Sequence, residues 1–290
     1  MPLGKNAGWL ALDPDTHTIY VTHINDNMMS VIDASTRTVT ATVPVNNPYG
    51  VAVDPGTHTV YVINHADNAV SVIDASTRTV TATVPVGKSP YGVAVDPGTH
   101  TVYVTNNGER TISAIDGPTR TVTATVTLPE GSPVARTPSG VAVDPGTHTV
   151  YVTNDPDEVS VIDGPTHTLT ASVRVGFDPT LVAVDPGTHT AYAANRDNVV
   201  SVIDGSTRAL AAKVPVGNNP FGVAVDPGTH TVYATNSDDN TVSVIDGSTR
   251  SVVATVPVGK GPGPVVVDPG THTAYVSISE DSALAVLESR

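Results

Sequence analysis

One stretch of the chain, residues 49–86, is enough to indicate the fold: YGVAVDPGTHTVYVINHADNAVSVIDASTRTVTATVPV. Four strand-like segments, 50–53, 59–62, 70–73 and 79–84, are separated in it by turn-forming residues. The first segment is continuously apolar, as in a strand buried on both faces, whereas the last alternates threonine with valine or alanine. Pro85 follows in that last segment, where an edge strand tolerates it. The stretch therefore predicts four β-strands, from a buried inner strand to a half-exposed outer one.

The same unit recurs along the whole chain. The string Asp-Pro-x-Thr-His-Thr occurs seven times, at intervals of 41, 42, 48, 41, 41 and 42 residues. Its aspartates are Asp13, Asp54, Asp96, Asp144, Asp185, Asp226 and Asp268. Four strands in a period near 41 residues are typical of a propeller blade. We therefore predict a single all-β domain over residues 1–290, a seven-bladed β-propeller with four-stranded antiparallel blades.

The sequence argues against two other repeat architectures. A helical solenoid needs apolar residues at helical spacing, and no window of the chain shows that pattern. A propeller of the Trp-Asp type needs its signature dipeptide, but the one tryptophan, Trp9, precedes Leu10.

Three segments carry a family resemblance. Residues 102–106 read Val-Tyr-Val-Thr-Asn, residues 242–246 read Val-Ser-Val-Ile-Asp, and an outer-strand segment ends in Val-Pro-Val-Gly-Lys at 256–260. In these segments the chain resembles the YVTN-type β-propeller repeat family. That family includes surface-layer and periplasmic proteins, lactonase-like enzymes and virginiamycin B lyases. The resemblance implies the fold and a periplasmic, secreted or cell-surface location, and it assigns no catalytic residue.

Composition narrows the classes of partner. The net charge of −14 and the scattered lysines and arginines argue against nucleic acid and against anionic membranes. No stretch is long and apolar enough for a spanning helix, and the first residues lack the apolar core of a signal peptide. Without cysteine there is no disulfide, thiol nucleophile or thiolate-bound zinc. We expect a monomer that binds a protein, a glycan or a small molecule.

Closure of the ring is predicted from the two ends of the chain. Six outer strands are evident, whereas the seventh blade ends after its third strand. Residues 1–4 align with the end of an outer strand, 214–217. We therefore predict that this segment lies beside residues 284–287 and closes the last blade with a short outer strand.

Comparison between the copies separates structural residues from candidate functional ones. Features that every blade shares have a structural explanation, so the seven Thr-His-Thr histidines are interpreted as turn residues rather than metal ligands. The repeated aspartates are interpreted as turn caps. Features confined to a few blades are the candidates for function.

The first candidate site is the channel mouth, where the inner strands begin. Bulky apolar residues gather there, and an apolar cup is the usual form of a small-molecule site. Two histidines of adjacent blades lie near this rim in the sequence pattern. The predicted ligand-binding residues are Trp9, Tyr49, Tyr91, Leu181, Phe221, His23 and His65.

The second candidate is a patch on blades four and five, beside the insertion of residues 127–137. Acids outside the repeat pattern are concentrated there, and nearby arginines or a divalent cation, calcium or magnesium, would offset their repulsion. The predicted members are Arg136, Asp155, Asp157, Glu158, Asp178 and Arg196.

Three functions remain open from the sequence. The near identity of the blades favours a non-catalytic recognition propeller that presents its variable loop face to a ligand. The alternatives are a metal-assisted lyase or lactonase with its site at the channel mouth, and a structural module of a larger surface protein. No phosphate-binding glycine loop or Ser-His-Asp spacing points to another enzyme class.

Overall fold

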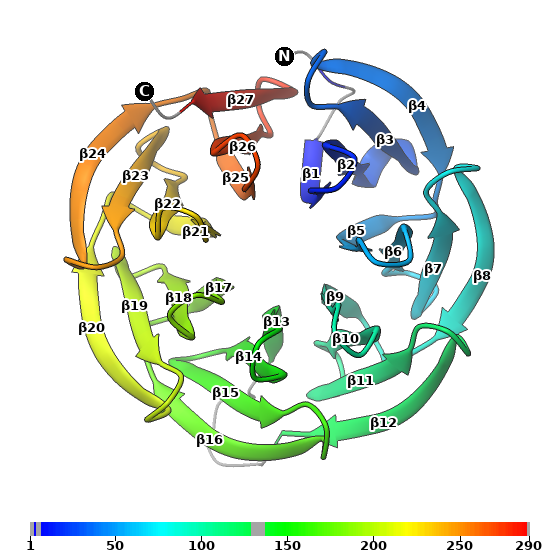
Figure 1. The fold of residues 1–290 in the computed structure, drawn as a ribbon, viewed down its shortest axis with the longest axis horizontal. Helices are drawn as coiled ribbons and strands as arrows, with labels where there is room; N and C mark the ends of the chain where they lie inside the picture. The colour runs from blue at the N-terminus through cyan, green and yellow to red at the C-terminus, as the bar shows by residue number, and fades with distance from the viewer. Residues whose placement is uncertain (1–2, 4–6, 129–136, 289–290) are drawn as a thin grey trace.

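The structure, a computed structural model, describes residues 3, 7–128 and 137–288. In these residues seven antiparallel sheets surround a central axis as the blades of a propeller (Figure 1). Six sheets have four strands and the last has three. The predicted fold and the number of blades are therefore confirmed. One short 3-10 helix, η1 (Ile24–Asp26), occurs in the described residues, and no helix there is long and apolar enough to cross a membrane.

In every blade the first strand lies nearest the axis and the last lies at the rim (Figure 1). The inner strands are β1 (Ala7–Asp13), β5 (Pro48–Asp54), β9 (Pro90–Asp96), β13 (Pro138–Asp144), β17 (Pro179–Asp185), β21 (Pro220–Asp226) and β25 (Pro262–Asp268). The second strands are β2 (Thr18–His23), β6 (Thr59–Asn64), β10 (Thr101–Asn106), β14 (Thr149–Asn154), β18 (Thr190–Asn195), β22 (Thr231–Asn236) and β26 (Thr273–Ile278). The third strands are β3 (Met28–Asp33), β7 (Ala69–Asp74), β11 (Thr111–Asp116), β15 (Glu158–Asp163), β19 (Val199–Asp204), β23 (Thr241–Asp246) and β27 (Ala283–Glu288). The outer strands are β4 (Thr38–Pro44), β8 (Thr79–Pro85), β12 (Thr121–Thr127), β16 (Thr168–Arg174), β20 (Ala209–Pro215) and β24 (Ser251–Pro257).

The core lies in the middle of each blade rather than at the axis. Second and third strands are buried along nearly their whole length, and the tyrosine of the second strand is among the largest enclosed side chains. Burial, reinforced by the nearby Asp54, raises the pKa of Tyr61 to about 12. The inner strand is only partly buried, since Tyr49, Ala52 and Val53 of β5 are partly exposed. The expectation that it is buried on both faces is therefore corrected.

The repeated histidines join neighbouring blades. In each of the seven pairs, the histidine Nδ1 of one blade lies 2.7–3.3 Å from the aspartate Oδ2 of the preceding blade. His17 of the first blade pairs in this way with Asp268 of the last, so the series closes on itself. The aspartates are buried, and their other oxygen caps the turn, as Asp54 Oδ1 accepts the amide of Gly56 at 3.1 Å. The histidines therefore have a structural role in holding the ring together.

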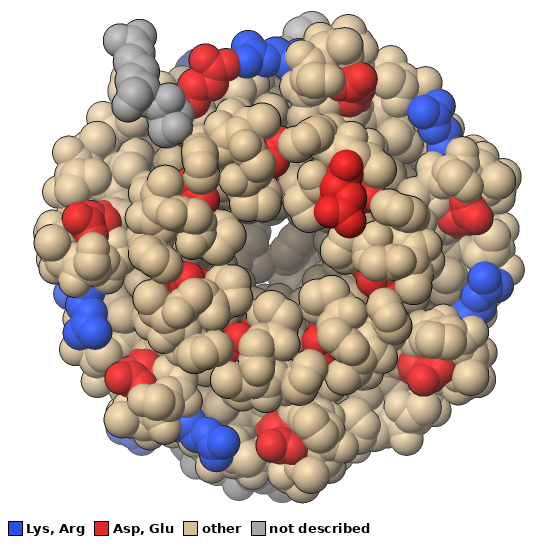
Figure 2. Space-filling model, in the orientation of Figure 1, with Lys and Arg blue, Asp and Glu red and all other residues tan. Residues whose placement is uncertain are grey.

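A second set of contacts between blades lies further out. Arg78 donates to the carbonyl oxygen of Thr40 at 3.2 Å, Arg120 donates to that of Thr81 at 3.3 Å, and Arg37 pairs with Glu288 across the closing blades. Figure 2 shows acidic and basic side chains recurring from blade to blade around a central opening. This regular pattern supports the structural interpretation of the repeated charges.

Acid should weaken the fold through the exposed turns after the third strands. Hydrogen bonds from the Ser76 hydroxyl and the Thr77 amide lower the pKa of Asp74 to about 2, and the equivalent aspartates have pKa values lowered by the same kind of bond. Since folding favours the ionised form, this stabilisation is complete above the ordinary aspartate pKa and is lost as the pH falls towards 2. Thermal unfolding followed from pH 5 to pH 2 should show a falling midpoint, and Asp74→Ala should make the fall shallower. A midpoint independent of pH over this range would contradict the role of these caps.

In the described residues, Leu3 of the N-terminal segment contacts the last blade. The amide of Leu3 donates to the carbonyl oxygen of Ser282 at 2.8 Å. In the other blades the residue after the outer strand makes the equivalent bond, as Val216 does with Asn198 at 3.0 Å. Leu3 also packs against a cluster that contains Leu284. Residues 1, 2 and 4 lie outside the described residues. The hydrogen bond of Leu3 is with Ser282, just before the predicted 284–287, and its packing cluster includes Leu284 of that range.

Candidate functional site

The mouth of the central channel is built from an irregularity near the start of every inner strand. The pairing of β5 with β6 shifts between Pro48 and Val51, which leaves Tyr49 and Gly50 outside the regular ladder. The same kind of shift occurs in the other inner strands. Such irregularities re-aim side chains. Here they turn two residues of each blade towards the axis, the positions at which the blades differ most.

Glycine fills the second of these positions where adjacent blades approach each other most closely. A Cβ on Gly92 would lie 2.3 Å from the carbonyl oxygen of Ser139 in the next blade. The amide of Gly92 donates to Thr105 Oγ1 at 2.8 Å, and that hydroxyl also contacts the Ser139 carbonyl oxygen at 2.8 Å. The threonine thus links two blades at the axis and holds the mouth in place.

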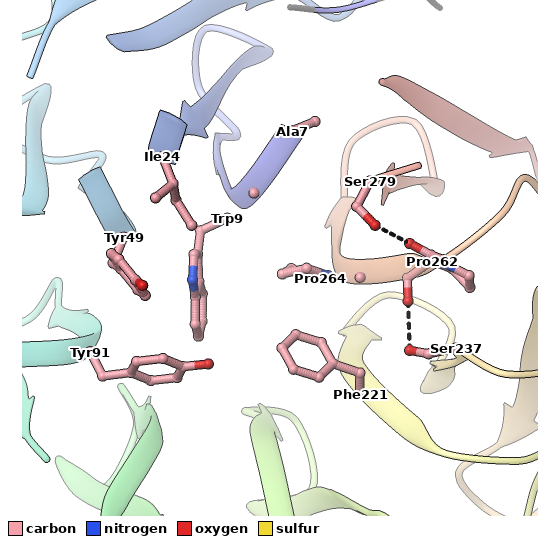
Figure 3. Close-up of a pocket in the computed structure, with 13 residues that line it drawn as sticks. Ala7, Trp9, Ile24, Tyr49, Tyr91, Phe221, Ser237, Pro262, Pro264 and Ser279 are labelled. Carbon is pink, nitrogen blue, oxygen red and sulfur yellow. Dashed lines mark hydrogen bonds between the residues drawn. The ribbon is translucent and has the colours of Figure 1, made fainter. Parts of the chain in front are cut away.

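An apolar hollow of about 370 Å³ opens at this mouth. Aromatic rings from four blades line it, those of Trp9, Tyr49, Tyr91 and Phe221. Trp9 meets Tyr91 edge to face with ring centres 5.2 Å apart, and Tyr49 lies 5.7 Å from Tyr91. Pro264 lies across the hollow from Trp9 (Figure 3). The structure thus brings together four of the predicted mouth residues.

Neighbouring polar groups hold the walls of this apolar hollow. His65 stacks on Tyr49 with ring centres 4.4 Å apart, and its Nδ1 lies 2.9 Å from the carbonyl oxygen of Pro90. On the other side, Ser237 donates to the carbonyl oxygen of Pro262 at 2.9 Å, as Figure 3 shows. His65 therefore supports an aromatic wall and is not itself part of the lining.

An acidic hollow of about 260 Å³ lies beside the first. It is lined by Asp155, Asp178, Arg196 and Leu181, and it shares Tyr91 and Phe221 with the apolar hollow. Arg196 Nε donates to Asp178 Oδ2 at 3.2 Å. The two candidate regions predicted separately from the sequence are therefore adjacent, with the rings of Tyr91 and Phe221 common to both.

Asp155 is a partly buried carboxyl group in this acidic hollow, and its pKa is raised. Partial burial raises its pKa, and the negative charges of Asp178 and Asp157 raise it further. Among the residues that the structure describes, no lysine or arginine lies within ion-pair distance of Asp155. Among the described residues, the lining of this hollow therefore carries two carboxylates, Asp155 and Asp178, against the one guanidinium of Arg196.

Two predicted site residues lie elsewhere. His23 is fully buried inside the first blade, where its Nε2 lies 2.9 Å from Ser30 Oγ, as Asn64 bonds Ser71 in the second blade. It replaces the usual asparagine and does not reach the mouth. Glu158 is buried at the start of β15, in register with Asn154 and Arg174. Both assignments to a binding surface are corrected.

The other members of the predicted patch do not form a metal centre in the described residues. Asp157 lies outside both hollow linings, and its main contact is the carbonyl bond to the amide of Val175 at 2.8 Å. Arg136 lies outside the described residues. Within residues 7–128 and 137–288, no three His, Asp or Glu side chains group closely enough to hold a metal ion. Binding of calcium or magnesium thus stays a prediction, and the described residues offer no group of three ligands for it.

The predicted site residues leave out several residues that the structure places at or near the mouth. Pro264 and Ile24 line the apolar hollow, and Thr180 lines the acidic one. Phe177 lies in the loop before β17 and is 61% exposed, whereas the equivalent residues are Lys88, Asn218 and Lys260. Comparing that loop position between copies would have singled out Phe177. Thr180 donates to the carbonyl oxygen of Phe221 in the next blade at 2.7 Å, and its signal in the sequence was Ala194, which stands where the third blade has Thr105.

Comparisons with known proteins bear on the fold alone. No family model matches the chain, and a search of curated proteins finds no match. Among solved structures, the hydrazine synthase of Kuenenia stuttgartiensis is similar, with a TM-score of 0.86 and 20% identity over 98% of this chain and 96% of that chain. At this identity the likeness shows a shared seven-bladed propeller and assigns no activity.

Proposed function

We propose that the protein is a non-catalytic binding propeller of the YVTN type, whose channel mouth takes a small ligand with an apolar body. The observation that carries the proposal is the hollow lined by Trp9, Tyr49, Tyr91 and Phe221. Its volume of about 370 Å³ is in the range of small-molecule sites, which are mostly apolar with a few polar groups. The acidic hollow next to it supplies those polar groups.

The repeat chemistry supports the family part of the proposal. In β10, the strand that carries Val-Tyr-Val-Thr-Asn, Tyr103 is buried and Asn106 donates to Ser113 Oγ at 2.9 Å. Thr105 makes the link between blades at the axis. Tyr103, Thr105 and Asn106 thus have structural tasks. Val-Tyr-Val-Thr-Asn itself occurs in two blades, at 102–106 and 150–154, and related segments stand in the others without marking a site.

A titration followed by tryptophan emission tests the binding function. Trp9 is the one tryptophan of the chain, so the emission comes from the proposed site itself. A neutral probe with two aromatic ring systems, N-phenyl-1-naphthylamine (the neutral two-ring probe), should quench Trp9 with a saturable curve. Its own emission should rise over the same concentration range. A linear, unsaturable response in the intact protein would overturn the proposal.

Catalysis at the same mouth is the second candidate, and Asp155 is the observation that favours it. A carboxyl group with a raised pKa in a hollow is the kind of group that serves as a general acid. An enzyme would bind the probe and also consume a substrate at a rate that Asp155→Asn abolishes. Binding without turnover in a panel of lactones and cyclic esters would favour the recognition function.

A further inference from the structure

The chemical class of the ligand can be inferred from the way the two hollows meet. The rings of Tyr91 and Phe221 line both of them, so a molecule in the apolar hollow can extend past these rings into the acidic one. Trp9 stands on the apolar side, and Tyr91 and Phe221 lie below it in the view of Figure 3. A ligand that fills both hollows therefore needs an apolar part and a polar end.

The sign of charge at that polar end follows from the lining. Arg196 is held against Asp178 at 3.2 Å, so its charge offsets one of the two carboxylates that line the acidic hollow. Asp155 remains without a lysine or arginine at ion-pair distance in the described residues, and Asp157 adds its field from nearby. An anion would meet repulsion there, whereas a cation would lower the cost of desolvating Asp155.

The aromatic walls favour an organic cation over a metal ion. A tyrosine or phenylalanine ring attracts an ammonium group through its π-system, and this attraction strengthens where water is excluded. A metal ion, by contrast, needs several oxygen ligands at short range, and the described residues offer no group of three. Two aromatic rings, with one carboxylate that no lysine or arginine of the described residues pairs with, are the elements of a site for an alkylated or primary ammonium group.

We propose that the channel mouth binds an organic ammonium compound. Its cationic end lies in the acidic hollow beside Asp155 and the rings of Tyr91 and Phe221, and its apolar body lies against Trp9 and Pro264. This inference rests on the proposed binding function and gives it a ligand class. The hollow and its rings define the site, and Asp155 sets the preference for positive charge.

Calorimetric measurement of the affinities of three related probes tests the inference. Benzyltrimethylammonium, benzyl alcohol and phenylacetate share a benzyl group and carry positive, no and negative charge. The cation should bind at least about tenfold more tightly than the alcohol. The anion should bind most weakly, and the preference for the cation should shrink as salt is added, because exposed charges are screened.

Two variants locate the preference in the structure. Asp155→Asn should reduce the advantage of the cation over the alcohol to about threefold or less, mainly by weakening the binding of the cation. Asp157→Asn removes the same charge from a residue outside the lining, so it should retain most of the advantage. If the alcohol and the cation bind equally well, the ammonium inference is wrong and the binding function stands. If neither these probes nor the neutral two-ring probe binds, both proposals fail.

Discussion

Replacing Asp54 by alanine is expected to lower the midpoint of thermal unfolding by about 5–10 °C, the shift that a loss of about 2–4 kcal/mol produces in a domain of this size. Asp54 is fully buried, its Oδ1 accepts the amide of Gly56 at 3.1 Å, and its Oδ2 lies 2.7 Å from His100 Nδ1 in the next blade. The substitution removes the turn cap and one link between blades at once. It also leaves His100 beside an empty space.

Asp15→Ala is the matched control for Asp54→Ala. Asp15 stands in the equivalent turn of the first blade and carries the same charge, but its side chain is exposed. Differential scanning calorimetry should show a shift for Asp15→Ala within about 2 °C of the parent, as for most surface substitutions. His100→Gln should fall between the two variants. Equal midpoints for Asp54→Ala and the parent would show that the links between blades contribute little to stability.

Tyr91→Ala should weaken binding of the neutral two-ring probe by about 10–100-fold, because burying an aromatic side chain against a ligand contributes about 1.5–3 kcal/mol. Tyr91 lines both hollows and contacts Trp9 edge to face at 5.2 Å. Its loss removes the wall that the two hollows share. The measurement is the Trp9 titration, repeated on each variant.

Two further variants make the Tyr91 result specific. Tyr91→Phe keeps the ring and should bind within about threefold of the parent. Phe177→Ala removes an aromatic ring that is 61% exposed and lines neither hollow, so it should bind like the parent. A loss of affinity in Phe177→Ala that equals the loss in Tyr91→Ala would place the ligand outside the mouth.

The fold could be predicted almost completely from the sequence, because each blade repeats its turn and strand chemistry. The recurrence of Asp-Pro-x-Thr-His-Thr gave the number of blades and the position of the turn between the first and second strands of each. The partner of each histidine could not be predicted in the same way. Periodicity shows that His100 and Asp54 recur together, but only the packing of one blade on the next shows that they pair across the boundary.

The candidate site was predicted in part, for reasons that differ between residues. Trp9, Tyr49, Tyr91 and Phe221 occupy the irregular start of an inner strand, so their place at the mouth followed from alignment of the copies. Tyr91 of blade three and Phe221 of blade six line the same hollow, and this depends on how the seven blades close around the axis. Such contacts across the axis have no signature in the local sequence.

The two corrected residues show the limit of reasoning from departures in a repeat. His23 departs from the asparagine of other blades, yet it makes the same kind of bond to the serine of the third strand. Glu158 departs in charge, yet it is simply the first residue of β15. Its hairpin loop is one residue shorter than that of the second blade, since Asn154 pairs with Glu158 whereas Asn64 pairs with Ala69. An unusual residue can therefore perform the usual structural task.

A crystal structure of the protein soaked with benzyltrimethylammonium and, separately, with the neutral two-ring probe tests the central claim most directly, since it shows where a bound ring lies. The account predicts aromatic density at the channel mouth between Trp9, Tyr91 and Phe221, with the ammonium group of the cation turned towards Asp155. Well-occupied density for both compounds in the outer grooves between blades, with nothing bound at the mouth, would contradict it.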